Sequence, residues 1–402
     1  MSEQRQRLAI VATHPIPYYV PLYRALARDG SLRVKAFFAS YVGLRPTVDP
    51  GMGVSIVWKS NLLEGYDHEF LPGADKVVGS ARFRDVDNPG TERALRRFQP
   101  DVVLIHGYSW KTAVRALLWC RRKKIPALMI SDGSLHSGTR PLIAKVKMLL
   151  LPWVFRKFSA FLAIGDANER YLSEFKVQES QVFRVPMMLD ELFWSSRNNS
   201  DATRAIARAE LGLQESDFAA LYVGKLIPRK RPRDLLEALS RLVSGPTANR
   251  KPIQVLFVGD GILRDELQRF ASAESLPARF FGFVNIDDLP KYYCAADVLV
   301  HPAEIEAYGA IVLEAAVQKL PLILSDKVGA IGATSVARPG ENTIVYPCGN
   351  VGALADQLQS LASDPGLAAA MSAASNRISE EHRGPASVLG TLAAVRYCSG
   401  SR

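Results

Sequence analysis

Two acids lie around the expected start of a helix in the C-terminal half of the sequence. Glu306 stands just before that start, near Gly309, and Glu314 lies about one and a half turns inside the helix among apolar residues. An acid in apolar surroundings needs a partner, and a ribose diol is a natural one because one carboxylate can accept both hydroxyl protons. The free amides of Ala310 and Ile311 at the helix start would attract an anion. The alternatives are a surface Glu306 and a Glu314 that forms a salt bridge to a sheet.

A second group of charges follows a predicted strand that ends at Gly224. Four cations lie within the next seven residues, namely Lys225, Arg229, Lys230 and Arg231. Glycine lets the backbone turn sharply after the strand, and Lys or Arg side chains are the usual partners of a diphosphate. The sequence therefore predicts a phosphate site here, with a solvated cationic turn as the alternative.

Gly259 and Gly261 flank an aspartate at the end of another predicted strand. Glycines at a turn from strand to helix can let a ligand approach the backbone. The pattern is neither a full GxGxxG nor a GxxxxGK[ST] phosphate loop, so a tight turn that only reverses the chain is the alternative. Because all three segments follow strands, we expect them to converge on one cleft.

The N-terminal half also has polar residues at or just after the ends of predicted strands. His106 ends a predicted strand, and Asp132 and His136 follow the next one. We expect these side chains to face the same cleft and to contact a bound ligand there. A purely structural role for either histidine is the alternative.

These segments need a scaffold of parallel strands. Apolar, β-branched runs alternate with helical patterns along the whole chain, which predicts an α/β fold with parallel sheets. The first series of strands is predicted at residues 8–12, 101–106, 126–130 and 161–164, and the second at 219–224, 254–259, 298–300 and 322–324.

The two series predict two domains. The polar stretch 195–201 between them is the best candidate for a linker. We therefore expect two doubly wound, Rossmann-like domains, one over residues 1–195 and one over 205–374, with a cleft between the carboxyl ends of their strands. A helix over residues 375–402 is expected to pack back on the first domain.

The composition is that of a soluble globular protein, with 48% hydrophobic and 22% charged residues among 402. Neither the four cysteines nor the six histidines have the spacing of a metal site, so no metal or other cofactor is expected. No apolar run reaches the ~18 residues of a membrane-spanning helix, and the N-terminus lacks a signal pattern, which predicts a cytoplasmic location.

The net charge of +10 calls for an anionic partner: nucleic acid, a membrane face or a phosphorylated substrate. Between residues 140 and 158, lysines and arginines mingle with leucines, Trp153 and Phe155. This pattern favours a patch that binds an anionic membrane surface, with an ordinary half-buried helix as the alternative. No RNA-binding, helix-turn-helix or zinc pattern supports nucleic acid.

The acidic segment resembles the signature of the family-4 retaining glycosyltransferases, which have the GT-B architecture. The family pattern P-S-x-x-E-G-F-G, followed by a second glutamate, reads here as Pro302 to Gly309 followed by Glu314. Gly224, Lys225 and Lys230 are similar to its G-R-x-x-x-x-K motif, with Lys225 in place of Arg. Residues 281–284 (Phe-Gly-Phe-Val) are similar to its F-x-G-x-V segment, and residues 13–24 resemble the opening of bacterial polysaccharide glycosyltransferases.

The resemblance implies a role for each matching residue. Lys225 and Lys230 would hold the donor diphosphate, Glu306 would contact the transferred sugar near the reacting carbon, and Glu314 would contact the ribose. The residues predicted to bind the donor are Gly224, Lys225, Lys230, Gly259, Gly261, Phe283, Val284, Tyr308, Gly309, Ala310, Ile311 and Glu314, and those predicted to act in catalysis are Glu306, Lys230, Lys225, His106 and Asp132.

The activity that the resemblance implies is transfer of a sugar, with retention of configuration, from a nucleotide-diphosphate sugar (the donor) to a lipid-linked or oligosaccharide acceptor. Its setting would be bacterial surface or exopolysaccharide assembly at the cytoplasmic face of the inner membrane. The domain of residues 1–195 would bind the acceptor, with His106 and His136 as contacts and Asp132 as a contact to either donor or acceptor, and the domain of residues 205–374 would bind the donor.

Asp287 and Asp288 form a DD pair rather than DxD, so we expect lysines and a helix N-terminus, instead of a metal ion, to stabilise the leaving diphosphate. An epimerase or phosphorylase of the same fold, and a non-catalytic partner subunit, are the alternatives.

Overall fold

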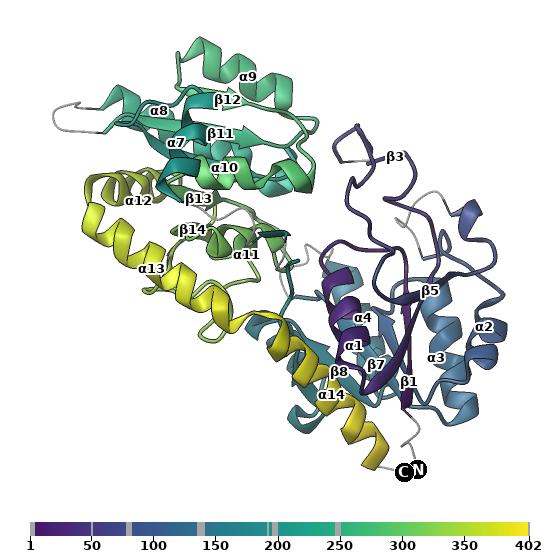
Figure 1. Cartoon of the computed structure of the whole chain (residues 1–402). Coiled ribbons are helices and arrows are strands. Elements are labelled where there is room, and N and C mark those ends of the chain that lie inside the picture. Colours follow the sequence, from purple (N-terminus) through teal and green to yellow (C-terminus); the bar gives the residue numbers. More distant parts are fainter. Residues whose placement is uncertain are drawn as a thin grey trace.

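The computed structural model describes residues 5–49, 51–77, 83–134, 141–190, 193–194, 200–245 and 251–400. Two α/β domains lie one above the other, each built on a twisted parallel sheet with helices on both faces (Figure 1). The predicted linker falls mostly outside the described residues, and the second domain begins with a helix capped by Ser200. None of the helices in these ranges is both long and apolar enough to cross a membrane.

The first sheet has the order β5-β2-β1-β6-β7-β8-β9 within the described ranges. Its central strands are fully buried apolar runs, as expected for a sheet covered on both faces. Its strands are β1 (Gln6–Ala12), β2 (Leu32–Phe38), β5 (Asp67–Phe70), β6 (Val102–His106), β7 (Ala127–Ser131), β8 (Ala160–Ala163) and β9 (Val182–Arg184). The helices around it are α1 (Val20–Asp29), α2 (Thr91–Phe98), α3 (Lys111–Lys123), α4 (Pro141–Phe155) and α5 (Asp166–Glu174).

The second sheet has the order β12-β11-β10-β13-β14-β15. Its strands are β10 (Phe218–Val223), β11 (Ile253–Val258), β12 (Ala278–Phe280), β13 (Val298–His301), β14 (Leu322–Ser325) and β15 (Thr343–Tyr346). The helices of this half are α7 (Asp201–Glu210), α8 (Pro232–Ser244), α9 (Arg264–Ala273), α10 (Pro290–Ala295), α11 (Ala310–Val317), α12 (Val351–Ser363), α13 (Pro365–Glu381) and α14 (Gly384–Gly400). Short 3-10 turns occur at η1 (Ala74–Lys76), η2 (Glu179–Gln181), η3 (Pro228–Lys230) and η4 (Ile286–Asp288).

The strand order explains why distant segments meet. The strand β10 lies between β11 and β13, and all three run parallel. The segments that follow them therefore leave the same edge of the sheet, and the order of the chain reverses at β10. The strand β1 has the same place in the first sheet, between β2 and β6. The two reversal points face each other across the gap between the domains.

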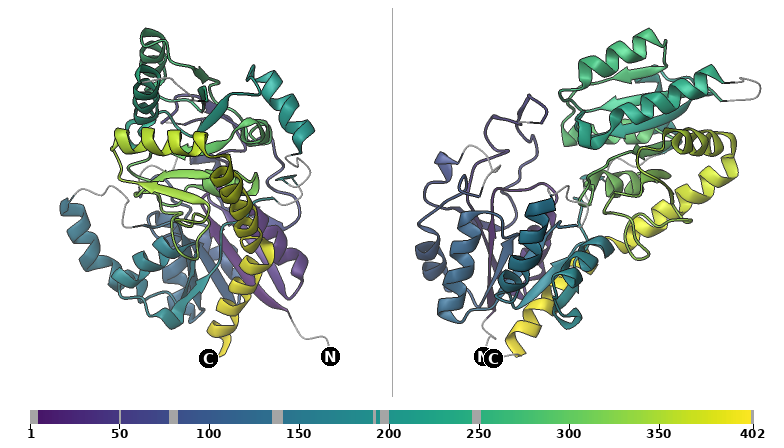
Figure 2. Two further views of the ribbon diagram at one scale, coloured as in Figure 1. Left: turned by 90° about the vertical axis from the view of Figure 1, so that its left-hand side faces the viewer. Right: turned by 180° about the vertical axis from the view of Figure 1, so that it is seen from behind.

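The C-terminal segment crosses from one domain to the other. The predicted single helix is two helices, α13 on the second domain and α14 against β8, β9 and α1 of the first, as both views in Figure 2 show. At the far end of α14, the side chain of Gln6 donates a hydrogen bond of 2.6 Å to Ser399. The end of the chain therefore packs on the start of the first sheet.

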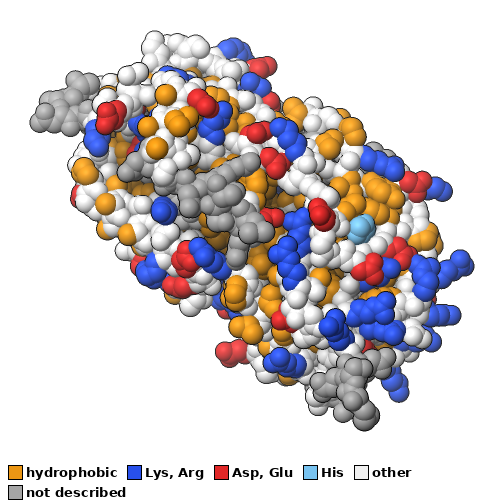
Figure 3. Space-filling model, in the orientation of Figure 1, with side chains coloured by type: hydrophobic (Ala, Val, Ile, Leu, Met, Phe, Trp, Pro, Cys, Tyr) orange, Lys and Arg blue, Asp and Glu red, His pale blue; other side chains and the backbone are white. Residues whose placement is uncertain are grey.

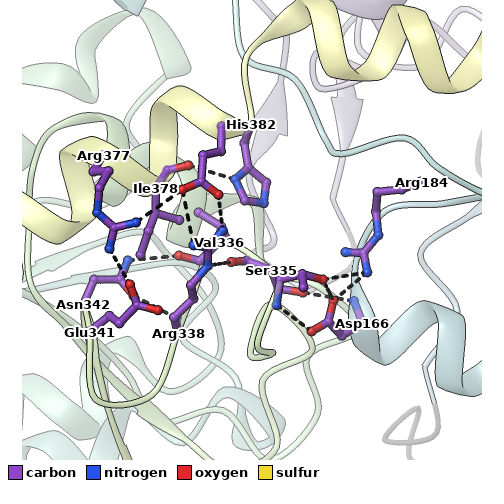
Figure 4. A network of polar contacts seen from close by, with 12 residues as sticks. Asp166, Arg184, Ser335, Val336, Arg338, Glu341, Asn342, Arg377, Ile378 and His382 are labelled. Carbon is purple, nitrogen blue, oxygen red and sulfur yellow. Dashed lines mark hydrogen bonds and ion pairs between the residues drawn. The ribbon is translucent and has the colours of Figure 1, made fainter.

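A polar network joins the domains where α13 turns into α14 (Figure 4). Arg184 of β9 donates a bond of 2.6 Å to Asp166 at the start of α5. The second domain adds Thr334, whose hydroxyl donates to the same carboxylate at 2.6 Å, and Ser335, which accepts from the Asp166 amide at 3.0 Å. Arg338 of the same loop pairs with Glu381 of α13. The domains are thus fixed to each other on this side of the cleft.

A long loop after β2 makes the opposite connection. It contains the hairpin β3 (Thr47–Val48) and β4 (Ser55–Ile56) and reaches over to the second domain. Asn285 donates a bond of 2.8 Å to the carbonyl of Val57, and Lys59 forms an ion pair of 2.8 Å with Asp288.

On the surface, Lys and Arg side chains gather over the first domain, at the lower right of Figure 3.

Candidate active site

A cleft of about 740 Å³ lies between the two domains, where the strand ends of both sheets meet. Both domains line it, as expected for ligands of open α/β sheets. Of the residues predicted from the sequence, those that line it are His106, Asp132, Gly224, Lys225, Lys230, Tyr308, Gly309, Ala310, Ile311 and Glu306.

Glu306 and Lys230 form an ion pair at the centre of the second domain's wall. The loop after β13 carries Glu306, and η3 after β10 carries Lys230. His301, the last residue of β13, lies 2.8 Å from the same carboxylate oxygen through its Nε2. Burial alone would raise the pKa of the Glu306 carboxyl, but the bond from His301 and the charge of Lys230 hold it at about 2. Glu306 is therefore ionised at any physiological pH.

Lys225 is paired across the cleft. Its ammonium group lies 2.7 and 2.8 Å from the two carboxylate oxygens of Asp49, in the turn of the β3–β4 hairpin of the first domain. Burial raises the pKa of the Asp49 carboxyl, and Lys225 and the amides of Gly51 and Met52 more than offset this, so that its pKa is lowered. The cation that directly follows Gly224 is therefore paired with a carboxylate of the first domain.

Glu314 is fully buried, one and a half turns inside α11. Its two oxygens accept hydrogen bonds from tyrosine hydroxyls, at 2.7 Å from Tyr18 and at 2.6 Å from Tyr293. Burial raises the pKa of this carboxyl, against the two hydrogen bonds. Tyr18 belongs to the first domain and lines the cleft. Glu314 itself lies behind this ring, and a ribose could reach it only if Tyr18 moved.

The first turn of α11 opens into the cleft. Gly309 precedes the helix with a φ of +91°, a left-handed conformation that favours glycine. Ala310 and Ile311 follow it and line the cleft. Amides at the start of a helix lack partners within the helix and favour anions. This helix start and the cations after β10 therefore face one space.

Gly259 and Gly261 lie behind the cationic turn instead of lining the cleft. A Cβ atom at Gly259 would lie 1.9 Å from the carbonyl oxygen of Gly224, and one at Gly261 would lie 2.4 Å from that of Leu226. The amide of Leu226 also donates a bond of 2.9 Å to the carbonyl of Asp260. Because these glycines lack a Cβ atom, the two backbone turns can pack directly against each other. In the structure, the glycines therefore support the turn that carries Lys225 and Lys230.

Phe283 and Val284 line a second pocket, of about 1020 Å³, beside α7 and α10. This pocket also contains Lys59, Asp287 and Asp288 and shares no lining residue with the cleft. The structure therefore does not place Phe283 and Val284 among the residues that line the cleft with Lys230 and Glu306.

On the first domain's wall, His106 is buried, and its Nε2 shares a hydrogen bond of 2.8 Å with the Tyr23 hydroxyl. Burial lowers the pKa of this imidazole to about 3, so it is neutral. Asp132 is open to the water of the cleft on one side. The surrounding protein, and then Glu306, raise the pKa of its carboxyl. His136 lies outside the described residues.

Comparison with known proteins assigns the family. Residues 203–377 match the model described as glycosyl transferases group 1, and residues 15–187 match the glycosyl transferase 4-like domain. A D-inositol 3-phosphate glycosyltransferase of Streptomyces avermitilis is 31% identical in an alignment of 415 positions, gaps included, that covers 94% of this chain and 85% of that protein. This chain belongs to the group 1 glycosyltransferases.

Comparison with solved structures shows the fold of this chain. Sucrose-phosphate synthase from Thermosynechococcus elongatus superposes with a TM-score of 0.76 at 18% identity, over 99% of this chain and 100% of that one. HepE of Anabaena, in complex with UDP-glucose, gives a TM-score of 0.70 at 15% identity, over 97% and 100%. The predicted GT-B architecture is confirmed. The chain spans only 37% to 53% of the length of the first curated relatives that it matches.

Three partners of the cleft residues were not predicted from the sequence, namely His301, Tyr18 and Asp49. His301 directly precedes the recognised Pro302 stretch, so its place at the end of a strand was a usable signal. Tyr18 and Asp49 lie in first-domain loops and contact residues of the second domain 296 and 176 positions away. No local sequence pattern predicts contacts between residues so far apart in the chain.

Proposed function

We propose that the protein transfers a sugar from a nucleotide-diphosphate sugar to an acceptor, with retention of configuration. The observation that supports this most is the partly buried Lys230–Glu306 pair on the wall of an interdomain cleft that also presents a helix start and Lys225. In the related fold of HepE the bound molecule is UDP-glucose. The family membership makes glycosyl transfer the leading activity for this site.

The chemical task is to break the bond between the anomeric carbon and the diphosphate. Positive charge fixed near the departing phosphates lowers this barrier most, because charge develops there in the transition state. Lys230, Lys225 and the first amides of α11 are the groups that would supply it. Glu306, held ionised, would stabilise the positive charge that grows on the sugar ring.

Donor binding requires two exchanges between protein groups. The diphosphate would replace Asp49 at Lys225, and the ribose would replace the Tyr18 hydroxyl at Glu314. In each case a ligand oxygen takes the place of a side-chain oxygen of the first domain. The ion pair and the hydrogen bond that the protein loses are thus replaced by an ion pair and a hydrogen bond to the donor.

We infer that the acceptor hydroxyl attacks from the face that the diphosphate leaves, and that a phosphate oxygen takes its proton. Such a step retains the configuration and needs no protein base. Asp132 and His106 would then position the acceptor. Donor turnover without acceptor, giving an isomer, would favour an epimerase instead. Phosphorolysis that depends on inorganic phosphate would favour a phosphorylase.

We also propose that the transfer needs no divalent metal. In the described parts of the chain, no three His, Cys, Asp or Glu side chains lie close enough together to hold an ion. Asp288 is engaged by Lys59, and Asp287 accepts a bond from Ser60. Turnover should persist in excess chelator; loss of turnover that only a divalent metal restores would contradict this proposal.

The acceptor is proposed to be a lipid-linked glycan of bacterial surface or exopolysaccharide assembly, reached at the cytoplasmic face of the inner membrane. The helix α4 supports this, because Leu149 is 79% and Trp153 is 62% exposed. Lys157 lies 3.5 Å from the centre of the Trp153 ring, and Lys147 of this helix lines the cleft. Apolar and cationic side chains together favour an anionic membrane surface.

Flotation with anionic liposomes tests the membrane proposal. Leu149→Ser combined with Trp153→Ser should abolish co-flotation. Ile262→Ser, at an equally exposed site on the second domain, should leave it unchanged. Wild-type protein that stays unbound at low and high salt alike would contradict membrane association. Inositol phosphate, named for the Streptomyces relative, belongs in the acceptor screen as the soluble alternative.

A screen of nucleotide sugars tests the donor assignment. Wild-type protein should bind one of them, measured by calorimetry, and hydrolyse or transfer its sugar. Glu306→Ala should abolish turnover and leave binding, whereas Lys230→Ala should weaken both. A Glu306→Ala variant with full turnover would remove the assignment, and binding without turnover by the wild type would favour a non-catalytic partner subunit.

A further inference from the structure

His301 is buried at the carboxyl end of β13, with 1% of its side chain exposed. Its Nε2 lies 2.8 Å from Oε2 of Glu306, the oxygen that also pairs with Lys230. We propose that His301 is a positioning residue that fixes the Glu306 carboxylate for glycosyl transfer. This inference rests on the proposed function and adds a residue to its machinery.

The chemistry of the imidazole determines which way this bond runs. Burial lowers the pKa of His301, so the ring is neutral and carries one N–H. The charged groups that face it are Glu306 and Lys230, and the Tyr222 ring lies 6.4 Å away. A carboxylate only accepts, so the proton must be on Nε2. Nδ1, buried and without a partner in the described ranges, is then a bare acceptor.

Lys230 cannot replace His301 in this role. An ammonium group has three N–H donors and can turn toward an incoming diphosphate, whereas the single N–H of His301 has no other acceptor within the described part of the site. When Lys230 engages the donor, His301 still holds Oε2 of Glu306. No described residue donates to Oε1, and Gly309 leaves room beside the glutamate, since a Cβ there would lie 3.1 Å from its Cγ. Oε1 is thus the oxygen left for the sugar.

Two substitutions separate positioning from simple support of the fold. His301→Leu keeps the volume and removes the donor, whereas the amide nitrogen of His301→Gln can take the place of Nε2. We expect His301→Leu to lower kcat about tenfold to a hundredfold, which is the loss of a hydrogen bond to a charged group, with donor Kd changed less than about twofold. His301→Gln should recover most of kcat. His68→Leu, on β5 of the first domain, is the matched control and should match the wild type.

Three results would overturn the proposal. The first is wild-type kcat in His301→Leu. The second is a folded His301→Gln that is as slow as His301→Leu. The third comes from the free protein, where ¹⁵N chemical shifts of the ring should show the proton on Nε2; a proton on Nδ1 refutes the inference without any turnover. If the wild type binds and turns over no nucleotide sugar, the proposed function itself fails, which is a different result.

Discussion

The two walls of the cleft satisfy their polar groups in different ways. On the second domain's wall, Lys230 pairs with Glu306, and Lys225 pairs with Asp49 from the opposite loop. On the first domain's wall, His106 is a neutral ring bonded to Tyr23, and Asp132 is exposed. Of the residues that the structure describes, three cations of the second domain line the cleft, whereas the first domain's wall carries one, Lys147, beside the carboxylate of Asp132 and otherwise neutral and aromatic side chains. The second domain's wall therefore suits a donor with two phosphates, and the first domain's wall suits an uncharged acceptor hydroxyl.

The largest effect should come from removing the charge of Glu306. Glu306→Gln keeps the shape but no longer stabilises positive charge on the sugar, so we expect kcat to fall about 10³-fold with donor Kd little changed. Steady-state kinetics measure both. Glu304→Gln, two residues earlier and 58% exposed, is the matched control and should behave as wild type. Equal kinetics for the two variants would mean that the charge of Glu306 makes no specific contribution to turnover, and the contrast between the two walls would then fail.

Lys230→Ala should have the next largest effect. It removes a cation from the diphosphate site and leaves Glu306 buried with one partner fewer, so we expect kcat/KM to fall about 10²-fold and the free energy of unfolding to drop by about 3 kcal/mol. Turnover assays and urea unfolding measure the two changes. Lys327→Ala, whose partner Asp326 is exposed, serves as control. A loss of stability without any loss of turnover would assign Lys230 to the fold alone.

On the opposite wall, His106 predicts a dependence of stability on pH. Its folded pKa, about 3, lies below the unfolded value near 6.5. The unfolded chain therefore binds an extra proton between these values, and stability falls as pH drops below about 6.5. From pH 7.5 to 5.5 this histidine should cost about 1 kcal/mol.

His106→Gln should reduce that slope in urea unfolding at the two pH values. Glu306, with its lowered pKa of about 2, adds a loss of the same sign only below about pH 4.5, so it does not disturb the comparison. An unchanged slope in His106→Gln would mean that the pKa of this ring is the same in the folded and the unfolded protein.

The smallest effect concerns the pair that joins the walls. Asp49→Asn leaves Lys225 without its carboxylate, so a donor diphosphate has less to displace. We expect Kd for the donor to fall about threefold, because both side chains are partly exposed. Asp288→Asn breaks another interdomain pair, with Lys59, outside the cleft; calorimetry should show no change for it. Weaker donor binding by Asp49→Asn would mean that Asp49 supports the site and does not compete for it.

The sequence predicts the parts of the site that follow from strand order. Because β10 and β13 are parallel neighbours, Lys230 and Glu306 had to leave the same edge of the sheet. Gly259 follows β11 on the other side of β10 and packs behind the turn that carries Lys225, which strand order alone does not reveal.

The sequence does not predict contacts that depend on how the two domains are placed relative to each other. The Tyr18 bond to Glu314 and the Asp49 bond to Lys225 join loops of different domains. The break between α13 and α14 was readable, since Gly384 and Pro385 mark the point where the second helix starts.

A structure of the protein with its nucleotide-diphosphate sugar tests the central claim directly. We predict the diphosphate within hydrogen-bond distance of Lys225, Lys230 and the first amides of α11, with Asp49 and the Tyr18 hydroxyl displaced. A diphosphate in the pocket beside Phe283, with the Lys230–Glu306 pair untouched, would contradict it.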